Sequence, residues 1–141
     1  MNEAFATAPS LTAAGAQRAL DAAAAHARDI GVAACIAVTD RAGHLLAFLR
    51  MDGAPVLSIR LAQDKAYSVA AFTGLPTHEW YGLLEDEPAL LHGIVKTPRL
   101  TIFGGGVPVL VDGALAGAVG ASGGSAEQDR AVAEAGAAGL R

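Results

Sequence analysis

Residues 107–121 read VPVLVDGALAGAVGA, and this stretch decides the fold. Two apolar runs, at 107–111 and 114–121, are separated only by Asp112 and Gly113. An Asp-Gly pair between apolar runs predicts a two-residue turn that joins antiparallel strands, because both turn positions need a positive φ. The stretch therefore predicts a β-hairpin, and an antiparallel sheet becomes the framework for the rest of the chain.

A second hairpin is predicted closer to the N-terminus. Residues 34–40 (ACIAVTD) and 44–50 (HLLAFLR) are apolar runs on either side of a tight turn at 41–43. Both runs have the length and the β-branched or apolar content of strands. A further strand is predicted at 97–103, led in by Pro98. The predicted sheet therefore has five antiparallel strands.

The segments between the strands carry helical patterns. In residues 11–30, apolar side chains recur every three or four positions, and Gly31 follows as a helix-ending residue. Residues 85–93 are acidic and irregular, with one more turn of helix as the alternative. Strands and helices grouped in this way predict a single α+β domain at 11–141, preceded by a flexible arm at 1–10. The helices are predicted at 11–30, 55–72, 77–84 and 126–139.

Composition narrows the function classes. The chain has 141 residues, a net charge of −4 and a pI near 5.4, so it offers no basic face for nucleic acid. No apolar run approaches the roughly 20 residues that span a bilayer, and residues 1–10 do not resemble a signal peptide. We expect a cytoplasmic protein without membrane contacts. Only 17% of residues are charged, below the usual content of about 25%, which favours a homo-oligomer.

Two glycine-rich loops flank the hairpin of 107–121. The first contains Gly104, Gly105 and Gly106, and the second contains Ser122, Gly123 and Gly124. Neither has the spacing of a P-loop or of a dinucleotide-binding fingerprint. Backbone amides in such loops, and at the start of the helix that follows the second one, can hold a carboxylate or another anion. We expect these six residues to contact a small ligand, with turn geometry alone as the alternative.

Lys65 is the candidate catalytic residue. It lies beside the apolar stripe of the helix predicted at 55–72, so partial burial is expected. A desolvated lysine has a lowered pKa and can act as a base, an amine nucleophile or an anion clamp. The alternative is a structural lysine whose stem packs and whose ammonium pairs with an acid.

The histidines and the cysteine do not form a metal site by spacing. The four histidines have no H-x-x-x-H pair, and Cys35 is the only cysteine, expected to be a small buried hydrophobe. We therefore expect no site at which side chains alone hold a metal ion. His26 lies off the apolar stripe of its helix, where it faces solvent or another subunit.

Several segments, in the same order, resemble the GlcG/HbpS family, which includes the C-terminal domain of PduO-type corrinoid adenosyltransferases. The resemblance covers about residues 11–140. The segments that carry it are 38–48, 50–54, 62–68, 72, 76–77, 104–109, 112–113, 117–124, 127–129, 132–133 and 135–136.

The resemblance implies a profilin-like domain with a five-stranded antiparallel sheet flanked by helices, assembled into dimers and often octamers. Some members bind haem. Where these members are expected to have their haem-coordinating histidine, this chain has Pro9 and Ser10, which leaves His26 as the candidate ligand.

Two functional hypotheses follow. The first is an oligomeric binding protein for haem or a related small ligand. The second is an isomerase, hydratase or lyase that acts on a small carboxylate, with Lys65 as base or anion clamp.

Overall fold

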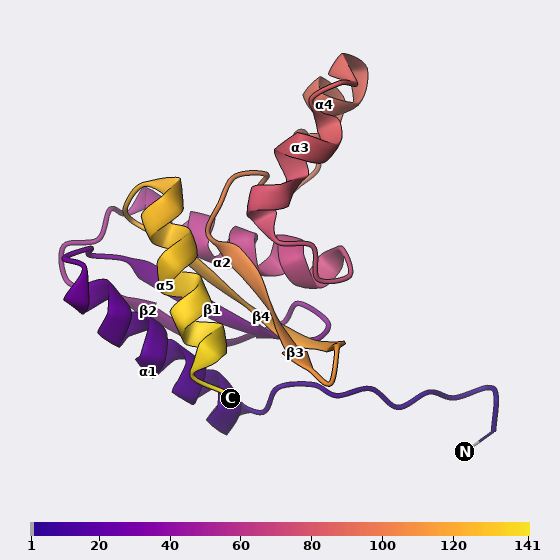
Figure 1. The fold of residues 1–141 in the computed structure, drawn as a ribbon, viewed down its shortest axis with the longest axis horizontal. Helices are drawn as coiled ribbons and strands as arrows, with labels where there is room; N and C mark the ends of the chain where they lie inside the picture. Colours follow the sequence, from indigo (N-terminus) through magenta and orange to yellow (C-terminus); the bar gives the residue numbers. More distant parts are fainter. Residues whose placement is uncertain (1) are drawn as a thin grey trace.

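The computed structural model describes residues 2–141 and forms one sheet with helices on both faces (Figure 1). Residues 2–10 lead away from the folded body as an extended arm. Among the described residues, no helix combines the length and the apolar character needed to cross a bilayer. The elements are α1 (Ala13–Asp29), β1 (Cys35–Asp40), β2 (Leu45–Arg50), α2 (Leu57–Ala71), the 3₁₀ turn η1 (Thr77–Glu79), α3 (Trp80–Leu84), α4 (Pro88–Ile94), β3 (Gly106–Val111), β4 (Ala114–Ser122) and α5 (Ala126–Ala138).

The sheet is antiparallel, with the order β2-β1-β4-β3. Both expected hairpins form, and β1 joins them by pairing with β4, so that Val38 lies opposite Val119. Asp112 (φ 51°) and Gly113 (φ 80°) make the tight turn between β3 and β4. The α+β class predicted from the sequence is therefore confirmed.

The prediction of five strands is wrong, because the described residues form a four-stranded sheet. Residues 97–103, predicted as a strand, lie instead against α2. There the Ser68 hydroxyl donates to the Arg99 carbonyl oxygen (3.0 Å) and accepts from the Thr101 amide (2.9 Å). Pro98 lacks an amide hydrogen, and Arg99 has a φ of 68°, so this backbone cannot continue a strand ladder.

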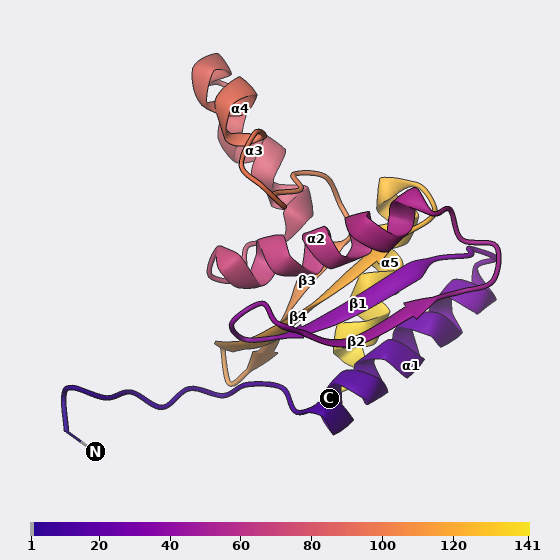
Figure 2. The ribbon, with the colours of Figure 1, turned by 180° about the vertical axis from the view of Figure 1, so that it is seen from behind.

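The sheet separates two apolar clusters. The helices α1 and α5 cover one face and α2 covers the other (Figures 1 and 2). In β1, Ile36 and Val38 face α1 and α5, whereas Cys35 and Ala37 face α2. A strand buried on both faces reads as a continuous apolar run, which is the pattern of 34–40 in the sequence.

The helix ends follow the capping rules. The Thr12 side chain accepts from the Gly15 amide at the start of α1, and Gly31 follows that helix with a φ of 74°. Ser125 and Gln128 form a reciprocal capping box at the start of α5. The segment 85–93, expected to be irregular, contains most of α4. Together, α3 and α4 project away from the body (Figure 1).

Gly120 allows α2 to approach the sheet closely. A Cβ at this position would overlap the carbonyl oxygen of Ala62 and lie 2.7 Å from the amide nitrogen of Ala66, both in the backbone of α2. Backbone cannot rotate away as a side chain can. The α2 helix can lie this close to β4 only because Gly120 has no side chain.

We predict that Gly120→Ala lowers the free energy of unfolding by about 3 kcal/mol, because α2 must shift to relieve the overlap. Gly93→Ala is the control, since Gly93 lies in α4 and a Cβ there meets no atom within 4 Å. It should leave stability unchanged or raise it by up to about 1 kcal/mol. Urea unfolding of both variants provides the measurement, and equal stabilities would contradict the close approach.

Candidate functional site

Lys65 forms a buried ion pair with Asp129. Its Nζ donates to Asp129 Oδ2 (3.1 Å) and to the Ala121 carbonyl oxygen (2.9 Å). The side chains are 1% and 4% exposed. The Phe103 ring lies over the ammonium, with its centroid 5.0 Å from Nζ. Because Lys65 belongs to α2 and Asp129 to α5, the pair joins the two helical layers at the end of β4.

The glycines of both loops make room for this pair. A Cβ on Gly105 would lie 2.6 Å from Lys65 Nζ, and one on Gly106 would lie 2.6 Å from the Lys65 carbonyl oxygen. The Gly124 amide donates to Asp129 Oδ1 (2.8 Å), so both carboxylate oxygens are engaged. Two of the expected ligand-contacting glycines, Gly105 and Gly106, therefore lie against Lys65, and a third, Gly124, binds its partner Asp129.

The other expected loop residues have different surroundings. Ser122 donates its hydroxyl hydrogen bond to Ser58 (3.1 Å), and a Cβ on Gly123 would overlap the Ala33 carbonyl oxygen. Gly104 lines an open hollow that also contains His78 and Arg130. Burial, then Arg130, lowers the pKa of His78.

The electrostatics of Lys65 reflect burial more than pairing. Burial lowers the pKa of its ammonium, and the Asp129 carboxylate raises it by a smaller amount. This arrangement matches the structural alternative, in which the stem packs and the ammonium pairs with an acid. Arg60 and Asp64, four positions apart on α2, also form an ion pair, with 3.4 Å between Nε and Oδ1.

His26 lies on α1, on the opposite side of the sheet from α2, and is half-buried. The fold does not gather it with Lys65. Among the described residues, no three His, Cys, Asp or Glu side chains come together in a group that could hold a metal ion.

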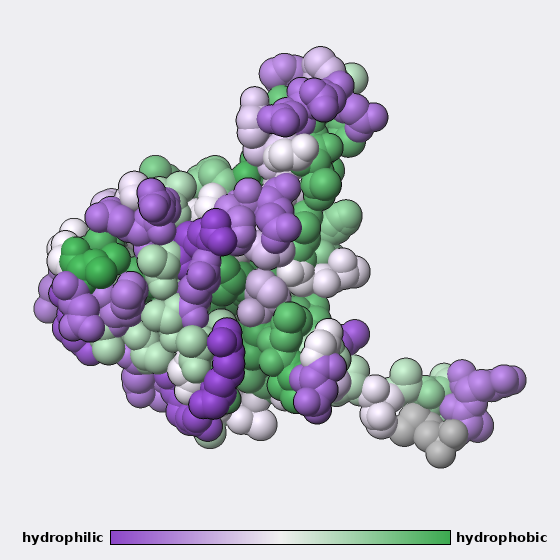
Figure 3. Space-filling view, viewed as in Figure 1, coloured by the Kyte–Doolittle hydropathy of each residue, from purple (hydrophilic) through white to green (hydrophobic). Residues whose placement is uncertain are grey.

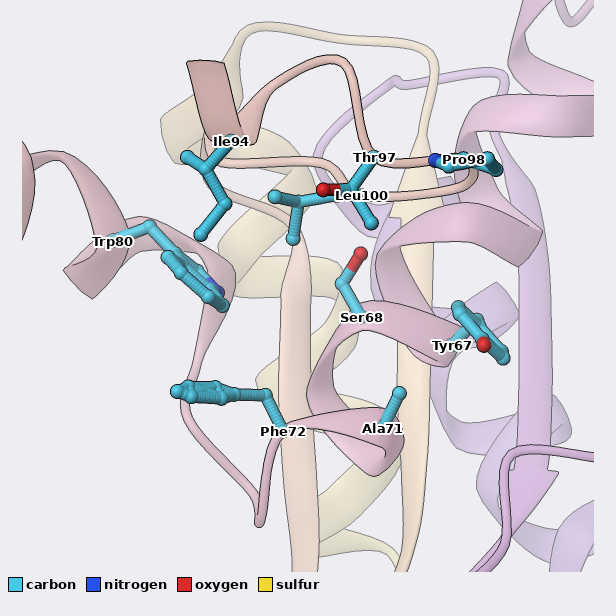
Figure 4. A pocket seen from close by; sticks show the side chains of 9 residues that line it. All are labelled: Tyr67, Ser68, Ala71, Phe72, Trp80, Ile94, Thr97, Pro98 and Leu100. Atoms are coloured by element: carbon cyan, nitrogen blue, oxygen red, sulfur yellow. The ribbon is translucent and has the colours of Figure 1, made fainter. Parts of the chain in front are cut away.

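An apolar cavity of about 270 Å³ opens between α2 and the segment that follows α4 (Figure 4). We call it the aromatic cavity. Phe72 and Trp80 stack at its edge, with ring centroids 4.7 Å apart. The lining residues are Tyr67, Ser68, Ala71, Phe72, Trp80, Ile94, Thr97, Pro98 and Leu100.

Trp80 places an unpaired donor at the aromatic cavity. The residue is 5% exposed, and its Nε1 has no hydrogen-bond partner among residues 2–141. Figure 4 shows the indole nitrogen on the ring edge that faces the cavity. The Ser68 hydroxyl is already occupied by three backbone groups. Among the residues that line the aromatic cavity, the Trp80 indole is therefore the buried polar group without a hydrogen-bond partner.

Comparison with known proteins places the chain in a family. Residues 11–138 match the family described as "Haem degrading protein HbpS-like". The chain belongs to the HbpS-like family. This confirms the resemblance to GlcG and HbpS seen in the sequence.

Sequence relatives and solved structures are similar to this chain over much or nearly all of its length. An uncharacterised 15.0 kDa protein of the dhaT–dhaS intergenic region of Citrobacter freundii is 40% identical over 88% of this chain and 87% of its own length. Protein GlcG of Escherichia coli K12 is 42% identical over 62% of each chain. The crystal structure of ORFY from Klebsiella pneumoniae has a TM-score of 0.90 and 35% identity, and covers 99% of this chain and 96% of that one. A PduOC:heme complex has a TM-score of 0.84 and 30% identity, and covers 94% and 96%.

Sequence reasoning missed the aromatic cavity. Its walls come from α2, from α3, from the end of α4 and from the segment that was predicted as a strand, so no single stretch indicates it. One signal was available: four of the seven aromatic residues of the chain lie within residues 67–81. In a sequence this poor in aromatics, such a cluster indicates a site where rings gather.

We predict that Lys65→Met lowers the free energy of unfolding by about 3–5 kcal/mol, because it leaves the Asp129 carboxylate buried without its partner. Lys96→Met is the matched control, since the exposed Lys96 is the only other lysine of the chain. It should change stability by less than about 0.5 kcal/mol. Equal unfolding midpoints for the two variants in urea would contradict a structural role for Lys65.

Proposed function

We propose that this chain is a small-ligand-binding protein and that the aromatic cavity is its ligand site. The observation that carries the proposal is the buried, unpaired Nε1–H of Trp80. A buried donor without an acceptor costs free energy, and a ligand acceptor would recover it. Mostly apolar walls with a few polar groups that orient the ligand are typical of small-molecule sites.

Haem is the first ligand that we propose. Support comes from the family description and from the PduOC:heme complex, which has the same fold. The stacked Phe72 and Trp80 rings present flat apolar faces suited to an aromatic ring. At about 270 Å³ the cavity is at the small end of ligand sites, so it would hold one edge of a tetrapyrrole. Bound haem would supply a redox-active iron.

Two side chains are candidates for the iron ligand. Among the residues that line the aromatic cavity there is no histidine, cysteine or methionine, but Tyr67 contributes a phenol, and tyrosine is a known haem ligand. His26 stays the candidate suggested by the sequence, and a haem held by it would lie against α1 instead. The two assignments therefore place haem on opposite sides of the sheet.

We also propose that the chain acts as a homo-oligomer, a dimer or an octamer. Exposed large apolar side chains gather on the projecting α3–α4 segment and at the end of β3 (Figure 3). They are Tyr81, Leu83, Leu90, Val95, Leu110 and Val111. Apolar surface concentrated in this way is typical of contacts between subunits.

An enzyme that acts on a small carboxylate is the second candidate function. The observation that favours it is the lowered pKa of Lys65, which brings the amine closer to the neutral form that a base or nucleophile needs. Its burial and its pairing with Asp129 require an opening of the structure before a substrate can reach it. Turnover that disappears in Lys65→Met at an unchanged folded fraction would establish this function.

We predict that haemin produces a Soret band when mixed with the protein and that Tyr67→Phe shifts its maximum and weakens binding. His26→Ala is the matched control and should leave the band unchanged if haem occupies the aromatic cavity. The reverse pattern would assign the iron to His26, and the absence of any haemin binding would favour the enzyme.

We predict a light-scattering mass of at least twice 14.1 kDa at micromolar concentration, because the exposed apolar side chains of α3, α4 and β3 become covered on assembly. A mass near 14.1 kDa under these conditions would contradict the oligomer.

A further inference from the structure

A second depression, here called the cationic hollow, lies between the β1–β2 turn, α2 and the loop that contains Arg99. Its volume is about 430 Å³. Two of its residues are arginines, and none is acidic. The lining residues are Gly43, His44, Leu45, Arg60, Gln63 and Arg99.

The two arginines share one counter-ion. Arg60 Nε lies 3.4 Å and Arg99 Nε 3.2 Å from the same oxygen, Oδ1 of Asp64. Asp64 does not line the hollow, and its side chain is 14% exposed. His44 lies 3.4 Å from Asp40. At Asp64 two guanidinium groups therefore meet one carboxylate, whereas Asp40 accepts from the amides of Ala42 and His44 within the β1–β2 turn. Both arginines face the carboxylate with Nε, which leaves their terminal amino groups for an anion.

Arg99 is held firmly in this place. Its guanidinium carbon lies 3.9 Å from the centroid of the Tyr67 ring, a cation–π contact. Its carbonyl oxygen accepts from Ser68, and its φ of 68° is in the left-handed region that a non-glycine residue rarely adopts. A strained backbone that persists because its surroundings hold it is common at binding sites.

The Tyr67 ring lies at the border between the cationic hollow and the aromatic cavity. Tyr67 lines the cavity, and Arg99, which lines the hollow, covers a face of its ring. Gly43 of the hollow also lies against this ring, since a Cβ there would be 3.2 Å from Tyr67 Cδ2. An apolar chamber and a cationic chamber therefore adjoin across a single aromatic side chain.

We propose that the two chambers form one bipartite site for an amphipathic anion, whose ring system lies in the aromatic cavity and whose carboxylate lies at Arg60 and Arg99. The inference rests on the proposed function and adds the ligand's chemical class to it. A free aromatic acid and a haem propionate share this chemistry. A neutral apolar molecule would fill only half of the site.

The test compares two probes of the same shape, 2-naphthoate and the neutral 2-naphthamide. Trp80 is the only tryptophan of the chain, so its indole N–H gives a single resonance in a nitrogen–proton NMR spectrum and reports on the cavity directly. Titration of each probe against this resonance gives its affinity. We expect 2-naphthoate to bind about tenfold more tightly than 2-naphthamide at low salt, and the difference to shrink as salt rises.

Arg60→Met is the test variant. The Arg60 side chain is 72% exposed, so the fold does not depend on it. It should weaken 2-naphthoate about three- to tenfold and leave 2-naphthamide unchanged. Arg28→Met removes an exposed arginine of α1 on the other side of the sheet and controls for overall charge. It should leave both affinities unchanged.

The outcomes separate this inference from the proposed function. Equal affinities of the two probes, or equal losses in Arg60→Met and Arg28→Met, would overturn the bipartite site and leave the aromatic cavity as a ligand site. A Trp80 resonance that responds to neither probe nor to haemin would overturn both. If 2-naphthoate binds more tightly than 2-naphthamide, a comparison of haemin with its dimethyl ester shows whether the carboxylate at the hollow belongs to a haem propionate or to a smaller acid. A loss of affinity on esterification assigns the hollow to propionates, and no loss assigns it to a smaller acid.

Discussion

The ion pair of Lys65 and Asp129 is the constraint on which the rest of this structure depends. It joins helices on opposite faces of the sheet, and it does so inside the protein, where each charge needs its partner. The ammonium also donates a hydrogen bond to the Ala121 carbonyl oxygen, and the carboxylate accepts one from the Gly124 amide. Position 105 has no room for a side chain, because Lys65 Nζ would lie 2.6 Å from a Cβ there.

This ion pair fixes the position of α2, and α2 in turn supplies part of the wall of the proposed ligand site. The helix carries Lys65 toward the sheet and, within the next two turns, turns Tyr67, Ser68 and Ala71 toward the aromatic cavity. Ser68 then holds the loop at Arg99 through backbone hydrogen bonds. The α2 helix therefore has one face that packs on the sheet and another that lines the proposed ligand cavity. Lys65, the candidate catalytic residue of the sequence analysis, lies on the face that packs on the sheet.

The sequence predicted those parts of the fold that local patterns specify. The Asp112–Gly113 turn and the apolar run of β1 are each encoded within a few residues, and each formed as expected. The predicted fifth strand does not form, because the backbone path of 97–103 depends on hydrogen bonds to Ser68, about 30 residues earlier in the chain. The acid that pairs with Lys65 is 64 positions away, and the walls of the aromatic cavity come from four segments, so neither could be assigned without the fold.

We propose that ligands bind at the aromatic cavity rather than at Lys65 and the glycine loops. A crystal structure of the protein with 2-naphthoate tests it most directly. We predict electron density for the naphthalene ring against Phe72 and Trp80, with the carboxylate on the side of Tyr67 where Arg60 and Arg99 lie. Density at the amides of Gly104–Gly106 or Ser122–Gly124, with the Lys65 amine turned toward the ligand, would contradict it.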